Sequence, residues 1–166
     1  FPELSSDAKE RTILVNGVSK TYSMTGWRIG YAAGNPKVIS AMSNLSGQST
    51  SNPTSISQKA AIEAFSGTQE KVKEMLAEIK TRKNYISSYL NEIKDIKCFV
   101  PDGAFYVFPN ISAYFGKKYN NKVITNSLEF TDFLLDVAKV AVVPGVEFGS
   151  DSHIRISYAT SMSDIK

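Results

Sequence analysis

The chain has 166 residues, of which 42% are hydrophobic and 21% charged, values typical of a globular protein that can bury a core. The net charge is +3 with lysines scattered along the chain, so no dense basic block predicts a nucleic-acid surface. With Cys98 as the only cysteine and His153 as the only histidine, the composition excludes an internal disulfide and multi-cysteine or multi-histidine metal sites, and argues against a Ser-His-Asp triad.

No apolar stretch approaches the roughly 20 residues of a membrane span, and no signal peptide is recognisable, so we expect a reduced, cytoplasmic setting. Residues 1–11 are polar and are predicted to form a loop or a short turn. A buried strand is predicted over residues 12–15 and a second strand over 29–33. Between them, Lys20 and Arg28 lie among apolar and hydroxyl side chains, a mixture typical of a ligand pocket.

Lys20 and Arg28 have complementary chemistry. A lysine amine becomes a nucleophile where burial or a neighbouring cation favours its neutral form. Arginine stays charged and offers a planar fork of donors that suits phosphate. A Schiff-base lysine beside an arginine that holds an anion is the arrangement that pyridoxal phosphate needs. Spacing alone favours the simpler alternative, a salt-bridged pair on an ordinary loop.

The same segment resembles a known family. Ser19-Lys20, followed by Met24-Thr25-Gly26-Trp27-Arg28-Ile29-Gly30-Tyr31, is similar to the cofactor-lysine segment of class I aminotransferases, and most of all to the bacterial-type aspartate aminotransferases. The resemblance implies that Lys20 bonds covalently to pyridoxal 5'-phosphate and that Arg28 binds its phosphate. Many members carry a phosphate-binding hydroxyl three positions before the lysine. This chain has Gly17 there, so that contact is absent or supplied elsewhere.

The next predicted helix begins at Asn35, whose side chain can cap it, with Pro36 at the first helical position. A hydroxyl-rich loop is predicted to follow over residues 46–54. The resemblance places such a loop at the subunit interface, near the cofactor phosphate of a neighbouring subunit, and Ser51 is the candidate for that contact. The alternative is a serine-rich loop with no such role.

Two more helices are predicted, over residues 55–65 and about 69–93. Ser55 with Gln58 has the spacing of a capping box at the start of the first helix. The second is a long amphipathic helix, capped by Thr68. In the resembled family a helix of this kind connects the large and small domains. A plain amphipathic core helix is the alternative.

A pair of strands is predicted over residues 97–100 and 104–108, joined at the turn signal Pro101-Asp102-Gly103. The segment around the second strand resembles the part of the small domain that faces the substrate, and Phe105 is the candidate for that position. Phe105 as a plain core residue is the alternative. Residues 111–125 are irregular in sequence and are predicted to form a surface loop.

The chain is predicted to end with a helix over 127–137, a short strand over 140–143 and an alternating strand over 153–158. Arg155 lies in that last strand, where an arginine must find an anion or remain exposed. The matching segment of the resembled family binds the substrate α-carboxylate through a bidentate pair, which implies this role for Arg155. A surface arginine on an edge strand is the alternative. His153 and Cys98 are predicted to be packing residues.

Together these features predict an α/β fold, the C-terminal part of a fold-type-I pyridoxal-phosphate-dependent transferase with an α+β small domain. Residues 1–68 are expected to supply the end of the large domain, and 69–166 the connecting helix and the small domain, with its last helix cut short. We expect a C-terminal fragment that is inactive alone. The family residues that contact the pyridine nitrogen, the cofactor oxygen and the ring are expected upstream.

The expected activity is transfer of an amino group between an L-amino acid and a 2-oxo acid, with aspartate as the family default. A homodimer is expected of the full-length protein, and no nucleic-acid or membrane partner is expected. Two alternatives stay open: a lyase or decarboxylase of the same fold, and a non-enzymatic regulator with an aminotransferase-like domain.

Overall fold

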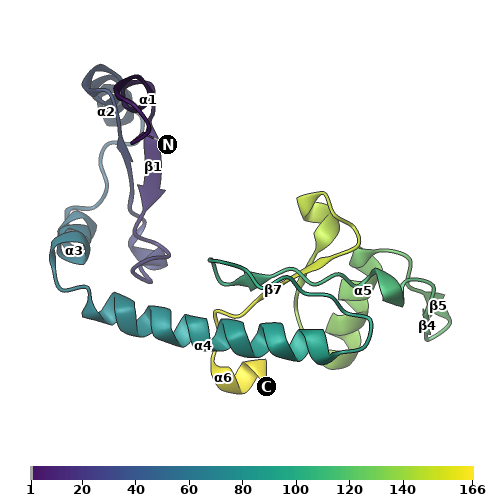
Figure 1. Ribbon diagram of the computed structural model, residues 1–166. Helices are drawn as coiled ribbons and strands as arrows, with labels where there is room; N and C mark the ends of the chain where they lie inside the picture. Colours follow the sequence, from purple (N-terminus) through teal and green to yellow (C-terminus); the bar gives the residue numbers. More distant parts are fainter. Residues whose placement is uncertain (1) are drawn as a thin grey trace. The chain divides into compact units, whose positions relative to one another are not determined.

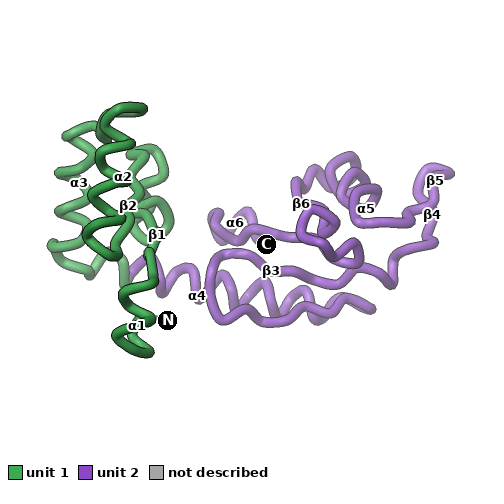
Figure 2. The backbone as a smooth tube through the Cα atoms, turned by 90° about the horizontal axis from the view of Figure 1, so that it is seen from above, with its two compact units in different colours: residues 1–73 green, residues 74–166 purple. Residues whose placement is uncertain are grey.

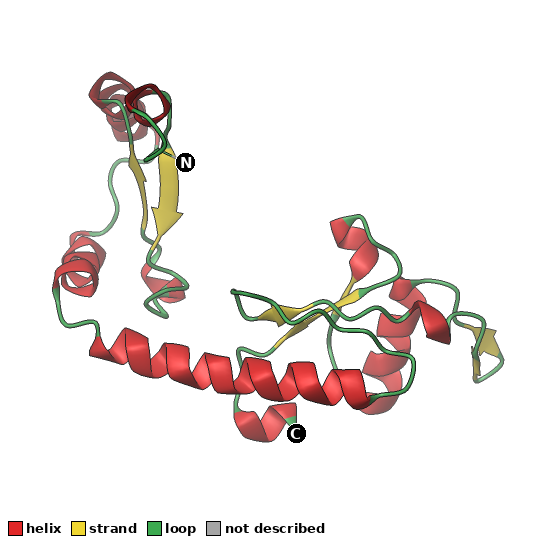
Figure 3. Cartoon of the chain, in the orientation of Figure 1, coloured by secondary structure: helices red, strands yellow, loops and turns green. Residues whose placement is uncertain are grey.

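The computed structural model describes residues 2–166, which divide between two compact units, residues 1–73 and 74–166 (Figure 2). Helices and short antiparallel strands occur in both units (Figure 3). The predicted mixture of helix and sheet is therefore confirmed. The predicted domain boundary at residue 68 stays a prediction, and of the predicted N-terminal loop, Phe1 lies outside the described residues.

The first unit is built on the antiparallel strands β1 (Leu14–Gly17) and β2 (Gly30–Ala33). A short helix, α1 (Ser6–Glu10), occupies part of the predicted N-terminal loop. It forms there because the hydroxyl of Ser5 caps it, accepting a hydrogen bond from the Ala8 amide at 3.0 Å. The prediction of a buried first strand is wrong for the described chain: β1 has only β2 beside it, and Val15 is 75% exposed.

Two helices complete the first unit, α2 (Pro36–Ser49) and α3 (Ser55–Ser66) (Figure 1). The predicted cap of α2 is confirmed, because Asn35 accepts a hydrogen bond from the Lys37 amide at 3.0 Å. This helix continues into the predicted loop and leaves only residues 50–54 between the two helices. The predicted capping box is wrong: Ser55 is already helical, and the Gln58 side chain donates to the Pro53 carbonyl at 2.7 Å.

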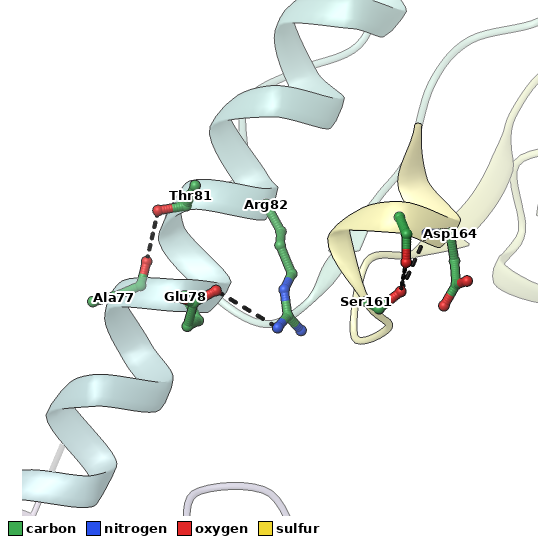
Figure 4. A network of polar contacts seen from close by, with 7 residues as sticks. Ala77, Glu78, Thr81, Arg82, Ser161 and Asp164 are labelled. Atoms are coloured by element: carbon green, nitrogen blue, oxygen red, sulfur yellow. Dashed lines mark hydrogen bonds and ion pairs between the residues drawn. The ribbon is translucent and has the colours of Figure 1, made fainter.

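The longest helix, α4, covers Glu70–Glu92. Its second half carries buried Ile86 and Leu90, which pack with residues of the C-terminal strands. One turn apart on this helix, the partly buried Arg82 and the exposed Glu78 approach to 3.7 Å, and Figure 4 shows this ion pair. No helix in the described part of the chain combines the length and the apolar character needed to cross a membrane.

The second unit contains a three-stranded sheet in the order β3 (Tyr106–Val107), β7 (Ile154–Ser157), β6 (Val143–Pro144). The pairing predicted between residues 97–100 and 104–108 is wrong, because β3 pairs with β7 instead. Tyr158 explains this choice. Its side chain is fully buried, its amide donates to the Phe105 carbonyl at 2.9 Å, and its hydroxyl donates to the Ala104 carbonyl at 3.0 Å.

The predicted surface loop over 111–125 is also wrong in part. It contains a 3-10 turn, η2 (Ser112–Tyr114), and a hairpin of β4 (Lys118–Tyr119) with β5 (Lys122–Val123). The turn residues Asn120 and Asn121 both have positive φ, which matches the tight turns that favour hairpins. Ile111 and Ile124 flank this hairpin and are buried in the second core of the unit, with Phe130 and Ile154.

Helix α5 (Ser127–Phe133) continues as a π-helical turn, η3 (Leu134–Ala138). The wider turn changes which side chains face the core, and Val137, the last residue of the predicted helix, is 46% exposed. A 3-10 turn, η4 (Gly145–Phe148), links β6 to the segment before β7. The chain ends in the short helix α6 (Met162–Ile165), whose amide at Asp164 is capped by Ser161 (Figure 4).

Candidate active site

Lys20 lies on a compact turn between β1 and β2. The turn begins at Val18, which is fully buried and donates its amide to the Ile29 carbonyl at 3.3 Å. Val18, Ile29 and Ala61 of α3 form the small core of this unit. The backbone on both sides of Lys20 is therefore anchored, whereas the Lys20 residue itself is exposed. Such an arrangement presents an amine at a defined place on the surface of the unit.

Arg28 has a left-handed backbone, with φ 54° and ψ 49°. Ser51 shares this feature, with φ 60°. Residues other than glycine rarely adopt this conformation, because the Cβ atom crowds the backbone. Strained residues of this kind often lie at functional sites, where the side chain is needed in that place. Six other non-glycine residues among those described also have positive φ, so this conformation alone gives neither residue a ligand contact.

The same two residues line one cavity of about 830 Å³. Arg28 enters from the start of β2, and Ser51 from the segment between α2 and α3. The rest of the wall includes the hydroxyl residues Ser43, Ser46 and Thr50. One guanidinium among several hydroxyls is a chemistry that suits a phosphate group. Lys20 is not among the lining residues of this cavity.

Gly17 occupies the position, three residues before the lysine, where many members of the resembled family have a hydroxyl. A Cβ atom built at Gly17 would lie 3.0 Å from the Ile29 carbonyl oxygen and 3.6 Å from the Gly30 Cα. A serine or threonine there would require β2 to move by a few tenths of an ångström. The cavity wall has hydroxyls at other positions, including Ser43 and Ser46 of α2.

Arg155 lies on β7 in the second unit, and its guanidinium is held between two aromatic rings. Its central carbon is 4.4 Å from the ring centroid of Tyr106 and 4.5 Å from that of Phe148. The ion pairs found among residues 2–166 do not include Arg155. The half-buried cation is therefore stabilised by ring faces, and its N–H donors are left for an anion.

Phe105 is half-buried and packs against the core cluster that contains Ile86 and Leu90. Its ring centroid lies 4.3 Å from that of Tyr106. Its predicted role toward the substrate stays a prediction. The sequence reasoning missed Tyr106 and Phe148, although the alternation of side chains along β3 and β7 could have indicated Tyr106 as a neighbour of Arg155.

The two predicted packing residues have that character in the structure. The His153 ring stacks on Phe108 with a centroid distance of 4.8 Å, and its Nδ1 lies 2.8 Å from the hydroxyl of Ser150. Cys98 is buried, and this burial raises the pKa of its thiol. A buried thiol with a raised pKa is a poor nucleophile.

Comparison with known proteins decides the family. The model of the family described as aminotransferase class I and II matches residues 2–166. The chain belongs to this family. The predicted resemblance and the predicted fold class are thereby confirmed.

Individual relatives of this aminotransferase chain agree. It is 51% identical over 165 residues to a probable aspartate/prephenate aminotransferase of Rickettsia typhi, and 48% identical over 160 residues to an aspartate aminotransferase of Bacillus subtilis. These alignments cover 99% and 96% of this chain, but only 41% and 40% of the relatives. The crystal structure of the aspartate aminotransferase from Rhizobium meliloti matches with a TM-score of 0.92 at 44% identity, covering 98% of this chain and 41% of that one.

Proposed function

We propose that the protein to which this chain belongs transfers an amino group between an L-amino acid and a 2-oxo acid, with pyridoxal 5'-phosphate as cofactor. The observation that carries this proposal is the place of Arg28 in the wall of a hydroxyl-lined cavity, close along the chain to the exposed Lys20. When bound, the cofactor supplies an electron sink for bond cleavage at the substrate α-carbon.

The residues of this chain have distinct roles in that chemistry. Arg28 binds the phosphate of the cofactor attached to this chain by charge-assisted hydrogen bonds, and Ser51 is proposed to contact the cofactor phosphate of a neighbouring subunit through its hydroxyl. Lys20 provides the covalent attachment point. With the cofactor and an amino acid bound, the freed Lys20 amine would accept the proton from the substrate α-carbon and deliver it to the cofactor carbon within the same half-reaction, acting first as general base and then as general acid. The anchored turn fixes the backbone on both sides of Lys20 and thereby the place from which its amine extends.

Arg155 binds the substrate α-carboxylate through a bidentate pair. The guanidinium fork matches the two carboxylate oxygens and fixes the direction of the substrate. This orientation decides which bond at the α-carbon is aligned for cleavage. Phe105 is proposed to face the substrate from the same small domain.

Aspartate is named for both the Rickettsia typhi and the Bacillus subtilis relative, and prephenate is named as well for the first of them. The resemblance further supports a homodimer in the cytoplasm. A lyase or decarboxylase of the same fold is the second candidate. Lyase activity releases its product without a 2-oxo acid, so the requirement for an oxo acid separates the two.

The test uses the full-length, cofactor-loaded protein. Borohydride reduction followed by peptide mapping is expected to place the cofactor on Lys20, and a Lys20→Ala variant is expected to retain no covalent label. A label on another lysine of this unit, such as Lys37, would contradict the assignment. Turnover is expected only with an amino acid and a 2-oxo acid together. Steady turnover with the amino acid alone would support the lyase instead.

A further inference from the structure

We infer that Phe148 and Tyr106 are positioning residues that hold the Arg155 guanidinium ready for a carboxylate. This inference rests on the proposed role of Arg155. Both rings lie within 4.5 Å of the guanidinium carbon, measured to their centroids, and they come from separate segments of the unit. Aromatic faces attract a cation and have no hydrogen-bond acceptor that competes for its N–H donors. The guanidinium is thus restrained without its donors being used.

One face of the paired strands builds this arrangement. Tyr106 and Phe108 alternate along the β3 segment, and His153 and Arg155 alternate along the β7 segment. Phe108 stacks on His153 and meets Phe148 edge to face at a centroid distance of 6.0 Å. Phe148 is therefore supported by a second ring in addition to its contact with Arg155.

The backbone that carries Phe148 is fixed by hydrogen bonds. The amide of Gly145, at the start of η4, donates to the His153 carbonyl at 2.8 Å, and the Val146 amide donates to the Ser127 hydroxyl at 3.2 Å. Ser127 is fully buried and donates its hydroxyl to Asp151 at 2.6 Å. Gly145 also admits no side chain, because an added Cβ would overlap the Ser150 and His153 carbonyls. Phe148 consequently extends from a rigid turn.

Restraint of this kind matters for binding. A free arginine side chain has several rotatable bonds, and ordering it on binding reduces affinity, by about two- to tenfold for one such side chain. Two rings that hold the guanidinium beforehand avoid most of that loss. If the rings merely covered apolar surface, their removal would affect stability and leave carboxylate affinity unchanged.

The test measures the dissociation constant of maleate, a dicarboxylate without an amine, on the full-length cofactor-loaded protein. Phe148→Leu, which keeps an apolar side chain but loses the ring, is expected to raise this constant about two- to tenfold. Phe148→Tyr keeps the ring and is expected to bind maleate as the wild type does. Phe99→Leu is the matched control, since Phe99 is 81% exposed and no ring pair or cation contact joins it to Arg155.

The same exchange in an Arg155→Lys background separates positioning from packing. Lysine lacks the planar group that the rings hold, so Phe148→Leu is expected to have no further effect on maleate affinity there. Unchanged affinity of Phe148→Leu in the wild-type background, or an equal loss in both backgrounds, would overturn the positioning role. If Arg155→Lys itself leaves maleate binding unchanged, or the wild type binds no maleate, the proposed carboxylate site fails instead.

Discussion

The left-handed backbone of Arg28 allows folding and cofactor binding to be separated by one substitution. In Arg28→Gly the strain disappears, which is worth roughly 1–2 kcal/mol for this conformation. Glycine loses more chain entropy on folding, roughly 0.5–1 kcal/mol. The exposed hydrogen bond from Arg28 Nη1 to the Thr25 carbonyl, 2.9 Å long, is also removed, at roughly 0.5 kcal/mol. These terms nearly cancel, so the free energy of unfolding should change by less than about 1 kcal/mol.

Cofactor binding should change far more. Each charge-assisted hydrogen bond to the phosphate is worth about 1.5–3 kcal/mol, so the loss of one already lowers affinity at least about tenfold. Arg28→Ala is the matched control: it removes the same guanidinium but keeps the left-handed strain, and should therefore be less stable than Arg28→Gly.

The assay has two readouts on the full-length protein. Denaturant unfolding of the cofactor-free form gives the stability of both variants, because bound cofactor would itself stabilise the fold. Titration with pyridoxal phosphate, followed by absorbance, gives the affinity. Unchanged affinity in both variants would remove Arg28 from the phosphate site. A loss of stability above about 2 kcal/mol in Arg28→Gly would refute the reasoning from backbone strain.

Three further predictions follow from the second unit. Ser87 is 2% exposed, and its hydroxyl has no hydrogen-bond partner among the described residues. Ser87→Ala should therefore raise the free energy of unfolding, measured by chemical denaturation, by about 1 kcal/mol. A lower free energy of unfolding would reveal a hydrogen bond to this hydroxyl. The hydroxyl and then the amide of Ser127 lower the pKa of Asp151, so this carboxylate stabilises the fold above its ordinary pKa, and the benefit is lost as the pH falls through the lowered value. Ser127→Ala should raise the Asp151 pKa and reduce the amount of unfolding free energy that is lost between neutral and acid pH. Carboxyl NMR measures the pKa, and unfolding at several pH values measures the free energy. An unchanged pKa would show that Ser127 does not cause the shift. Arg155→Lys should impair both half-reactions with acidic and neutral amino acids alike while cofactor loading survives, because the bidentate geometry is lost. Single-turnover measurements check this, and a loss confined to acidic substrates would make Arg155 a side-chain specificity residue.

The helices of the first unit were predictable because their signals are local. Asn35 and Pro36 mark the start of α2 within adjacent residues, and Gly67 ends α3. The Lys20 segment was also recognisable, since its residues are contiguous in the sequence. The end of α2 was misplaced because serines permit both helix and loop, and propensity alone does not decide between them.

The second unit was harder to predict because its strands are short and pair over long sequence distances. The chain does bend after Pro101, as the turn signal Pro101-Asp102-Gly103 predicts. The strand that follows nevertheless pairs with β7, and Tyr158 donates two hydrogen bonds to the residues just before that strand. The positive φ also falls on Ala104 and not on Gly103. A local pattern predicts where a chain bends, whereas burial of a large side chain elsewhere decides the partner.

The two candidate arginines show the same distinction at the level of function. The role of Arg28 was predicted from the family resemblance of its segment, and the structure adds the left-handed backbone and the cavity that it shares with Ser51. A carboxylate partner could be predicted for Arg155 from the sequence, but the two rings beside it could not. Tyr106 lies beside Arg155 because of the strand register, and Phe148 because of the turn that Ser127 anchors. A residue that binds can therefore be recognised in one segment, whereas the residues that orient it depend on contacts between segments that only the folded chain brings together.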